Sequence, residues 1–595
     1  MILPPFITVL TGILLLPRAA ESALHTAPSQ LSRTEYDFVI VGAGTAGNVL
    51  ANRLSEESSF TVLVVEAGIP NSAVVADEVP YLASTLFPNT PLTWNYTTAS
   101  QSGLNGREIT YPRGRALGGS STINLQAWTR ASRDDWDRFA NFTGDSGWSW
   151  DEIFPYMIKS ESLVQPPDHH NTSGAIVPSL HGTTGPVQIS LGGFPMETDQ
   201  RVLNTTQELP EEFPFNEDMN SGSPLGIGWL PFSVDTQGKR SSSATAYLQP
   251  IISRPNVDVL VMTQVTQIIA SGTVNGLPHF DAIQVAQSRT SSRMQIMAKK
   301  EVILSAGAVN SPLLLQLSGI GNPATLRAVG IKPIVELNDV GQNLADHPFL
   351  TVQWSVDSTA ETTDLIARNA TLANQLLQEW ETTGTGRYCD PGSNQVAWLK
   401  AGGDTQDASA GPTAAQIELM FFDGFVSLVQ GIPATGDFFT VGVAVSSPFS
   451  RGSITLASND PFDSPVIDPG LLSDSRDMSV MVQAVKMAMQ MLQASTWDGY
   501  ILKPATELSP TSSDAEIANF ARNFTSTEFH PAGSLRMAPS SSQEGVVNPN
   551  LQVKGASGLR VVDASVFPFI PAGHLQACVY AVAERAGDLI KQDWL

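Results

Sequence analysis

Short apolar runs typical of buried strands open the main body of the chain. Residues 36–41 form one such run, rich in β-branched side chains, and residues 60–65 form a second one. Between them, a glycine-rich turn at 42–47 leads into residues 48–54, whose apolar spacing predicts a helix. This order predicts a strand, a tight turn, a helix and a second strand, which is the repeating unit of a parallel α/β sheet.

The turn between these elements has the chemistry of a dinucleotide site. Gly42 permits a sharp turn, Gly44 lets the backbone approach a pyrophosphate, and Gly47 lets the helix and strand pack closely. Free N–H groups at the helix start would face the anion, and Glu66, just after the second strand, can accept hydrogen bonds from ribose hydroxyls. A glycine-rich turn in an ordinary α/β core is the alternative. The acid favours an adenosine without a 2′-phosphate but does not separate FAD from NAD.

The first residues form a different pattern. Residues 1–16 are apolar, and small residues follow up to position 23. This run is too short to span a bilayer and predicts a secretory signal over 1–23, with a membrane anchor or buried helix as the alternative. Six Asn-x-Ser/Thr sequons agree with export to the cell exterior and predict N-glycans at Asn95, Asn141, Asn171, Asn204, Asn369 and Asn523.

Composition narrows the classes of partner. In 595 residues, 57 acidic side chains outnumber 33 basic ones, for a net charge of −24. This excess disfavours nucleic acids and anionic membranes as partners, because both are bound through basic surfaces. The only cysteines are Cys389 and Cys578, too few for a Cys-based metal centre. They could form one disulfide or remain two buried thiols.

Two further glycine-rich blocks carry a family resemblance. Residues 111–124 surround Gly118 and Gly119 with arginines and hydroxyls, which predicts a second backbone-lined anion site, or else a plain Gly/Ser loop. This block and residues 307–321 resemble the two signatures of the glucose–methanol–choline (GMC) oxidoreductases, which are flavoproteins. The resemblance runs from about residue 36 to residue 589, and within the family it is strongest to the fungal aryl-alcohol oxidases.

The resemblance implies FAD bound in an extended form. Thr45 and Ala46 would face the pyrophosphate, and Glu66 with Ala67 the adenosine ribose. Some family members attach the flavin covalently through a histidine at the position of Asn124, so we expect non-covalent FAD here. The remaining contacts implied for the flavin, the adenine and the C-terminal side of the site are Asn124, Leu125, Gln126 and Ala127, then Val265, and finally Asp563, Ala564, Leu575 and Gln576.

Two of the eight histidines stand in contexts that resemble the family's catalytic pair. They are His530, followed by a proline and a nearby glycine, and His574, which directly follows a glycine. We expect His530 to accept the hydroxyl proton of an alcohol, because a neutral imidazole is basic near working pH, and His574 to orient the substrate oxygen. Metal binding is disfavoured because no carboxylate or Cys cluster accompanies the two in sequence. For His181 and His347 we expect structural hydrogen bonds.

Helical spacing over 575–590 adds an electrostatic element. This helix would begin beside His574, and its positive end would stabilise negative charge on a reduced flavin. A terminal packing helix is the simpler alternative, and both can hold.

The fold class expected is α/β (α+β): a Rossmann-like FAD-binding domain with a second, substrate-binding domain on a mostly antiparallel sheet. The FAD-binding domain must be discontinuous, because its motifs are scattered along the chain. We assign 34–190, 235–345 and 530–595 to it, and 191–234 and 346–529 to the substrate-binding domain. Residues 420–433 are apolar and punctuated by Gly and Pro, so they are either a lid over the pocket or a strand and its turn.

The function expected is oxidation of a primary, aromatic or allylic alcohol to the aldehyde, with dioxygen reduced to hydrogen peroxide. A dehydrogenase that uses a quinone or another acceptor is the alternative, including one that acts on a specialised metabolite. A hydroxynitrile lyase and a non-catalytic binding protein are less favoured. Leu125 stands where aryl-alcohol oxidases carry an aromatic gate residue, which implies a wider or differently shaped pocket.

Overall fold

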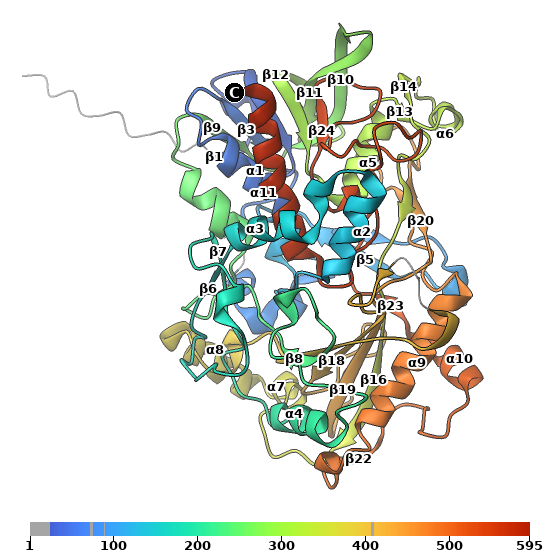
Figure 1. Ribbon diagram of the computed structural model, residues 1–595. Coiled ribbons are helices and arrows are strands. Elements are labelled where there is room, and N and C mark those ends of the chain that lie inside the picture. Colours follow the sequence, from blue (N-terminus) through green and yellow to red (C-terminus); the bar gives the residue numbers. More distant parts are fainter. Residues whose placement is uncertain (1–23, 72–74, 89, 406–409) are drawn as a thin grey trace, which may run out of the picture.

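The computed structural model describes residues 24–71, 75–88, 90–405 and 410–595, so the predicted signal segment 1–23 lies outside the described residues. Two large β-sheets organise the chain (Figure 1). One lies in the upper part of the view with the C-terminal helix, and the other lies in the lower part. This mixed α/β architecture confirms the fold class expected from the sequence.

The first sheet has the strand order β1-β9-β3-β2-β12-β11-β10, with β24 also paired to β12. Its centre is parallel, because β2 pairs in parallel with β3 and β12. The two strands expected around the glycine turn are confirmed as β2 and β3. The bounds are β1 Leu24–His25, β2 Glu35–Val41, β3 Val62–Val65, β9 Val257–Leu260, β10 Gln264–Val274, β11 Leu277–Ala286, β12 Met294–Leu304 and β24 Leu559–Val561.

The second sheet is antiparallel throughout and has the order β22-β16-β19-β18-β17-β8, with β23 paired to β16. All its strands fall within the segments 191–234 and 346–529. Its central strands are buried on both faces, so they consist of nearly continuous apolar runs. The bounds are β8 Gly226–Trp229, β16 Pro348–Val356, β17 Gln395–Leu399, β18 Ile417–Phe422, β19 Asp437–Val445, β22 Ile501–Pro504 and β23 Ser526–Thr527.

Short strand pairs lie outside the two large sheets. They are β4 Thr93–Thr97 with β5 Thr110–Gly114, β6 Glu161–Leu163 with β7 Val187–Ile189, β13 Ile320–Gly321 with β14 Val335–Glu336, and the three strands β15 Gln342–Leu344, β20 Gly452–Thr455 and β21 Val466–Asp468.

Helices cover each sheet and close its core. α1 and α11 pack against each other beside the first sheet, whereas α9 packs on β18 and β19 of the second. The bounds are α1 Thr45–Leu54, α2 Arg133–Thr143, α3 Trp150–Ser160, α4 Asp199–Glu208, α5 Gly307–Leu317, α6 Pro323–Ala328, α7 Thr363–Arg368, α8 Ala370–Thr383, α9 Ser475–Met491, α10 Asp514–Phe524 and α11 Leu575–Trp594.

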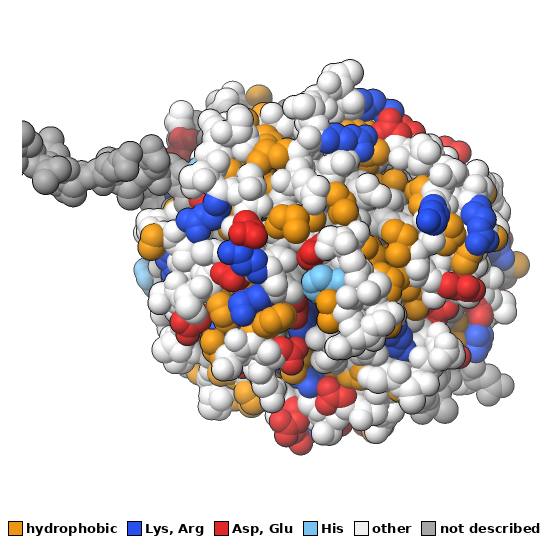
Figure 2. Space-filling model, turned by 90° about the horizontal axis from the view of Figure 1, so that it is seen from above, with side chains coloured by type: hydrophobic (Ala, Val, Ile, Leu, Met, Phe, Trp, Pro, Cys, Tyr) orange, Lys and Arg blue, Asp and Glu red, His pale blue; other side chains and the backbone are white. Residues whose placement is uncertain are grey.

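The structure also describes the cysteines, the surface charges and the apolar character of the helices. Cys389 and Cys578 are both buried free thiols, which resolves the alternative left open by the sequence. On the face shown in Figure 2, the Lys and Arg side chains of the described residues are scattered among acidic and apolar ones and form no continuous stripe. Within the described ranges, no helix has both the length and the apolar character needed to cross a bilayer.

Candidate active site

The glycine turn connects β2 to α1 as expected. Gly42 has φ +102°, and a Cβ there would lie 2.4 Å from the carbonyl oxygen of Ser305. A Cβ on Gly47 would lie 2.0 Å from the Gly42 oxygen, so this glycine serves close packing. At Gly44, the N-cap of α1, the nearest atoms to such a Cβ are 3.8 Å away. The space above Gly44 therefore faces the cavity rather than the protein core.

Glu66 holds this turn in place from within. Its Oε2 accepts from the Ala43 N–H at 3.0 Å and its Oε1 from the Gly68 N–H at 2.8 Å. Burial, opposed by these backbone donors, raises the pKa of Glu66 to about 7. Glu66 therefore supports the loop itself, in addition to lining the space where we expect a ribose.

One cavity of about 730 Å³ joins the glycine turn to the two histidines. This size is within the usual range for cofactor and ligand sites. Gly47 and Gly118 do not line the cavity. Gly118 has φ +91°, and a Cβ there would lie 2.1 Å from the Thr122 hydroxyl, so it shapes the second turn. The cavity is lined by all the other site residues expected from the sequence, namely Gly42, Gly44, Thr45, Ala46, Glu66, Ala67, Gly119, Asn124, Leu125, Gln126, Ala127, Val265, His530, Asp563, Ala564, Leu575 and Gln576, together with His574.

The residues of the cavity fit an extended dinucleotide. Gly44 offers a backbone surface that a Cβ would fill, and the N-terminus of α1 points into the same space.

The two predicted catalytic histidines meet in this cavity. Their ring centroids lie 5.1 Å apart and the rings are nearly perpendicular, at 88°. His530 follows β23, at the edge of the second sheet, and His574 is the N-cap residue of α11. The expected helix therefore exists and begins beside His574, so its positive end points at the cavity.

His574 is held by a carboxylate from the other sheet. Its Nε2 lies 2.8 Å from Oε1 of Glu418 in β18. Burial opposes a charge on the imidazole, but the charge and hydrogen bond of Glu418 raise the pKa of His574 to about 9. Burial and the charge of Glu528 raise the pKa of Glu418 to about 7. The pair thus retains a proton across the neutral pH range.

The surroundings of His530 shift its pKa in the opposite direction to that of His574. Burial lowers its pKa to about 4, with only partial compensation by Glu528. Its Nδ1 lies 3.1 Å from Nδ1 of His347 and 3.5 Å from Oε2 of Glu528. No hydrogen bond to Nε2 is formed within the described part of the chain, and the residue lines the cavity. At neutral pH His530 is therefore an uncharged imidazole.

One expectation about this cluster was wrong. Carboxylates do accompany the histidines, since Glu418 and Glu528 come from distant and neighbouring positions in sequence. His347 forms a hydrogen bond as expected, and its partner is His530. One signal for Glu418 was present: it is a lone acid inside the apolar strand β18. Ligand atoms in the groups His347–Glu528–His530 and Glu418–Glu528–His574 lie within 4.8 Å of one another, which would accommodate a cation, although imidazole–carboxylate pairs give the same spacing without one.

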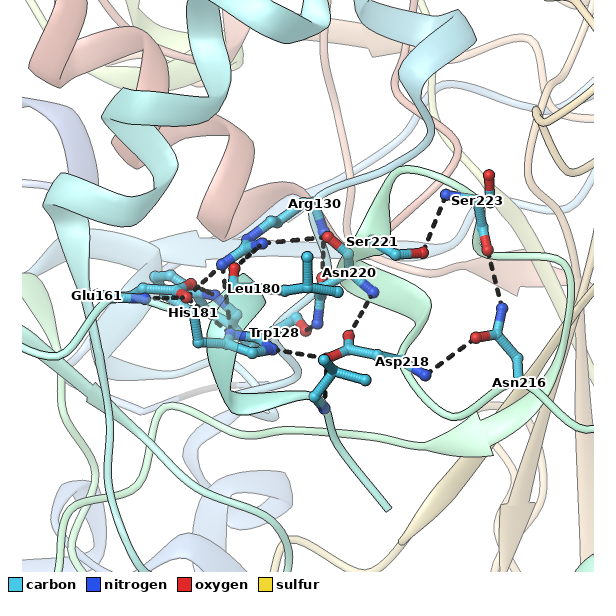
Figure 3. Close-up of polar contacts among 12 residues, drawn as sticks. Trp128, Arg130, Glu161, Leu180, His181, Asn216, Asp218, Asn220, Ser221 and Ser223 are labelled. Atoms are coloured by element: carbon cyan, nitrogen blue, oxygen red, sulfur yellow. Dashed lines mark hydrogen bonds and ion pairs between the residues drawn. The ribbon is translucent and has the colours of Figure 1, made fainter. Parts of the chain in front are cut away.

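A buried polar network supports the backbone that follows Ala127 (Figure 3). The guanidinium of Arg130 and the indole N–H of Trp128 both donate to Glu161, the latter at 2.6 Å. His181 lies between Glu161, at 2.7 Å, and Asp218, at 3.0 Å. Burial opposes its charge, yet these two acids raise the pKa of His181. The structural role expected for His181 is confirmed, and the network fixes the chain next to the cavity.

The segment 420–433 begins as a strand and continues as a loop, and whether this loop acts as a lid stays a prediction. Its first residues complete β18, and the following loop lines the cavity with Phe425, Leu428 and Ile432. Phe529 lines the cavity as well, in edge contact with Phe87 at 5.1 Å between ring centroids.

None of the six sequon asparagines is buried. Attachment of glycans to them remains a prediction.

Comparison with known proteins places this geometry in a family. Profiles described as GMC oxidoreductase match residues 36–349 and 448–583. Dehydrogenase eriK of Hericium erinaceus is 38% identical, over 98% of each chain, and a pyranose dehydrogenase of Agaricus campestris is 37% identical, over 97% of each. Among solved structures, a formate oxidase variant of Aspergillus oryzae, determined to examine FAD modification, has a TM-score of 0.85 at 28% identity, covering 94% of this chain and 99% of that one. A fungal aryl-alcohol oxidase has a TM-score of 0.82 at 27% identity, covering 94% and 100%.

The cavity joins the glycine turn to two histidines and is lined from both the mixed and the antiparallel sheet. Together with the family match, this identifies an FAD-dependent oxidoreductase. The chain belongs to the GMC oxidoreductase family, as its sequence motifs indicated.

Proposed function

We propose that this protein oxidises a primary alcohol on an aromatic or allylic carbon frame to the aldehyde. The observation that supports this most is a pair of imidazoles in one cavity whose surroundings drive their pKa values in opposite directions, to about 4 for His530 and about 9 for His574. Such divergence assigns acid and base roles to similar groups.

His530 serves as the general base. Its Nε2 faces no protein partner in the described residues, while Nδ1 is engaged by His347. A neutral ring that holds its proton on Nδ1 presents the lone pair of Nε2 to the substrate. The O–H bond of the alcohol breaks, and the proton is transferred to that nitrogen.

His574 serves as the hydrogen-bond donor that orients the substrate oxygen. Glu418 keeps the ring protonated, so a positive charge stands where the oxygen becomes negative. The N-terminus of α11 adds a positive partial charge of the same sign at the same place.

FAD would be held by the glycine turn, Glu66 and the segment at Gln126, which line one end and the wall of the cavity. We propose that it is bound without a covalent link, because Asn124 is an amide that cannot form the histidyl bond. When bound, FAD supplies the acceptor for the hydride released from the alcohol carbon and passes the electron pair to dioxygen, which gives hydrogen peroxide.

The side chains that line the cavity support an apolar substrate. Besides the two histidines, the cavity is lined by several large apolar side chains, namely Phe87, Phe349, Met420, Phe422, Phe425 and Phe529. A sugar would leave many hydroxyls without partners against such a wall, and that costs binding energy. We therefore favour an aromatic or allylic alcohol over a pyranose.

A dehydrogenase is the second candidate. It would carry out the same oxidation and deliver the electrons to a quinone or a similar acceptor, and it could serve the modification of a specialised metabolite. The relatives eriK and pyranose dehydrogenase, whose names describe dehydrogenases, favour this reading of the acceptor. We further propose that the protein is secreted and N-glycosylated, on the basis of the apolar start and the six sequons.

An anaerobic screen of alcohols tests the proposal. Loss of oxidised-flavin absorbance identifies the substrate, and admission of air then reports the acceptor. Release of peroxide supports an oxidase, whereas slow return of colour in air with rapid return on adding a quinone supports a dehydrogenase. Flavin that no alcohol bleaches, together with cleavage of a cyanohydrin, would point to a lyase and contradict the proposal.

A further inference from the structure

The geometry points to Glu528 and His347 as positioning residues that hold the proton of His530 on Nδ1 and stabilise the charge formed when Nε2 accepts a second proton. This inference rests on the proposed function, because it assigns the groups that make His530 a base. It concerns a third histidine and a carboxylate that no sequence motif assigned to the site.

The three side chains form a compact triangle. Nδ1 of His347 lies 3.1 Å from Nδ1 of His530, and Oε2 of Glu528 lies 3.5 Å from each of these nitrogens. The two rings are perpendicular, with centroids 5.2 Å apart. One of the two nitrogens must donate to the other. When Nδ1 of His530 donates, its Nε2 is left as the acceptor that catalysis needs.

Glu528 lies between the His530–His347 pair and the His574–Glu418 pair. Its side chain is only 8% exposed, and neither carboxylate oxygen accepts a hydrogen bond from any described residue. A buried carboxylate in that state is costly unless a positive charge is close. Burial works against its ionisation, but the surrounding imidazoles hold the pKa of Glu528 well below its usual range. Its charge is therefore present beside His530 and His347, and it acts on His574 and Glu418 as well.

Asp346 holds together the backbone segments that carry His347 and His530. It accepts from the backbone N–H groups of His347, at 2.8 Å, and His530, at 2.9 Å. The hydroxyls of Tyr111 and Thr527 donate to its other oxygen, both at 2.5 Å. Both histidines are thereby tied to one buried acid, although they are 183 positions apart in sequence. One buried acid thus holds together the two backbone segments that carry the rings.

The proton balance follows from this arrangement. The substrate O–H bond breaks and its proton forms an N–H bond at Nε2 of His530, while the electron pair of the carbon–hydrogen bond leaves as hydride to the bound flavin. The resulting imidazolium keeps its Nδ1 proton shared with His347, and Glu528 supplies the opposite charge. The other charged groups that face the ring are His574, at 5.1 Å between ring centroids, and its partner Glu418.

The test compares Glu528→Gln and Glu528→Asp with the unaltered holoenzyme by two measurements. The first is the nitrogen NMR spectrum of labelled histidine rings, with the His530 signals assigned by His530→Ala. It needs no substrate, so it reads the tautomer even if the proposed function fails. The second is the anaerobic rate of flavin reduction by an alcohol as a function of pH. Glu544→Gln, which removes an exposed carboxylate of the same kind, is the matched control.

We expect the proton of His530 to be on Nδ1 in the unaltered protein and to shift toward Nε2 in Glu528→Gln. The limiting reduction rate should fall ~10–10²-fold, the scale on which partners of a reacting histidine act, with the substrate dependence of the rate unchanged. The acidic limb of the pH profile should move to lower pH, because loss of the carboxylate lowers the pKa of His530. Glu528→Asp should recover part of the rate.

Three results would overturn the inference. One is an unaltered tautomer of His530 in Glu528→Gln, and another is an unaltered reduction rate in that variant. The third is loss of activity on treatment with a chelator and its return with Zn²⁺, which would make the cluster a metal centre. Absence of flavin reduction by any alcohol in the unaltered enzyme would count against the proposed function alone, since the tautomer measurement would still decide the role of Glu528.

Discussion

Nε2 of His574 lies 2.8 Å from Oε1 of Glu418, and this contact joins the two halves of the molecule at the cavity. His574 caps α11, which packs beside the first sheet, whereas Glu418 belongs to β18 in the second. The charge state of His574 thus depends on how the two sheets are placed relative to each other.

Glu418→Gln should lower the pKa of His574, because the amide keeps the shape of the carboxylate but removes its charge. We expect flavin reduction on the order of 10-fold slower at pH 8, and an alkaline limb that moves below pH 9. Stopped-flow reduction across a pH series measures both. A profile identical to that of the unaltered protein would show that Glu418 does not control His574.

The unaltered enzyme should reduce its flavin only within a pH window. Below about 4 His530 becomes protonated and cannot accept the hydroxyl proton, so the rate falls as pH decreases. Above about 9 His574 loses its proton and no longer donates to the substrate oxygen, so the rate falls again. A rate that rises steadily through pH 9 would contradict the donor role of His574.

His530→Ala should slow flavin reduction by ~10²–10⁴-fold, the usual scale for loss of a general base. FAD should stay bound, because the glycine turn and Glu66, which would hold the dinucleotide, are unchanged in this variant. His170→Ala is the matched control, since His170 lies in an exposed loop beside Asp168. Equal rates in the two variants would remove His530 from the reaction.

The glycine turn offers a paired test of cofactor binding. Gly44→Ala adds a Cβ with no protein atom closer than 3.8 Å, at a φ of −88° that alanine accepts, so the apoprotein should melt at an unchanged temperature. Its affinity for FAD should fall on the order of 10-fold, because the methyl group enters the cavity. Fluorescence titration of the apoprotein with FAD measures this change.

Gly47→Ala provides the contrast. Its Cβ would lie 2.0 Å from the Gly42 carbonyl oxygen, so the fold itself should lose about 1–3 kcal/mol of stability. Thermal melting of the apoprotein distinguishes the two variants. Similar melting temperatures for both would mean that the helix can shift away from the strand.

FAD should be released when the protein is denatured with acid. Asn124 forms hydrogen bonds through its side chain with Gln576, at 3.0 Å, and Arg240, at 2.7 Å, and an amide does not bond covalently to the flavin methyl group. Precipitation with trichloroacetic acid should leave yellow supernatant and a colourless pellet. A yellow pellet would reveal a covalent link through another residue.

The sequence by itself determined the elements in which chemistry and chain order coincide. The turn at Gly42, Gly44 and Gly47 lies between two strands that follow one another directly, so local pattern was enough to predict β2, α1 and β3. His530 and His574 could be identified in the same way, because each stands within a short, recognisable stretch that resembles the family. The two-sheet architecture followed from the family resemblance, since scattered motifs alone do not specify pairing between distant strands.

Only the tertiary structure decided which groups control the two imidazoles. Glu418 is 156 positions from His574, and His347 is 183 positions from His530. The pKa of a histidine depends on its burial and on charges within a few ångströms, and neither can be known until strands far apart in sequence are packed together. The sequence could therefore name the pair, but only the packing of one sheet against the other moved the pKa values of the two histidines in opposite directions.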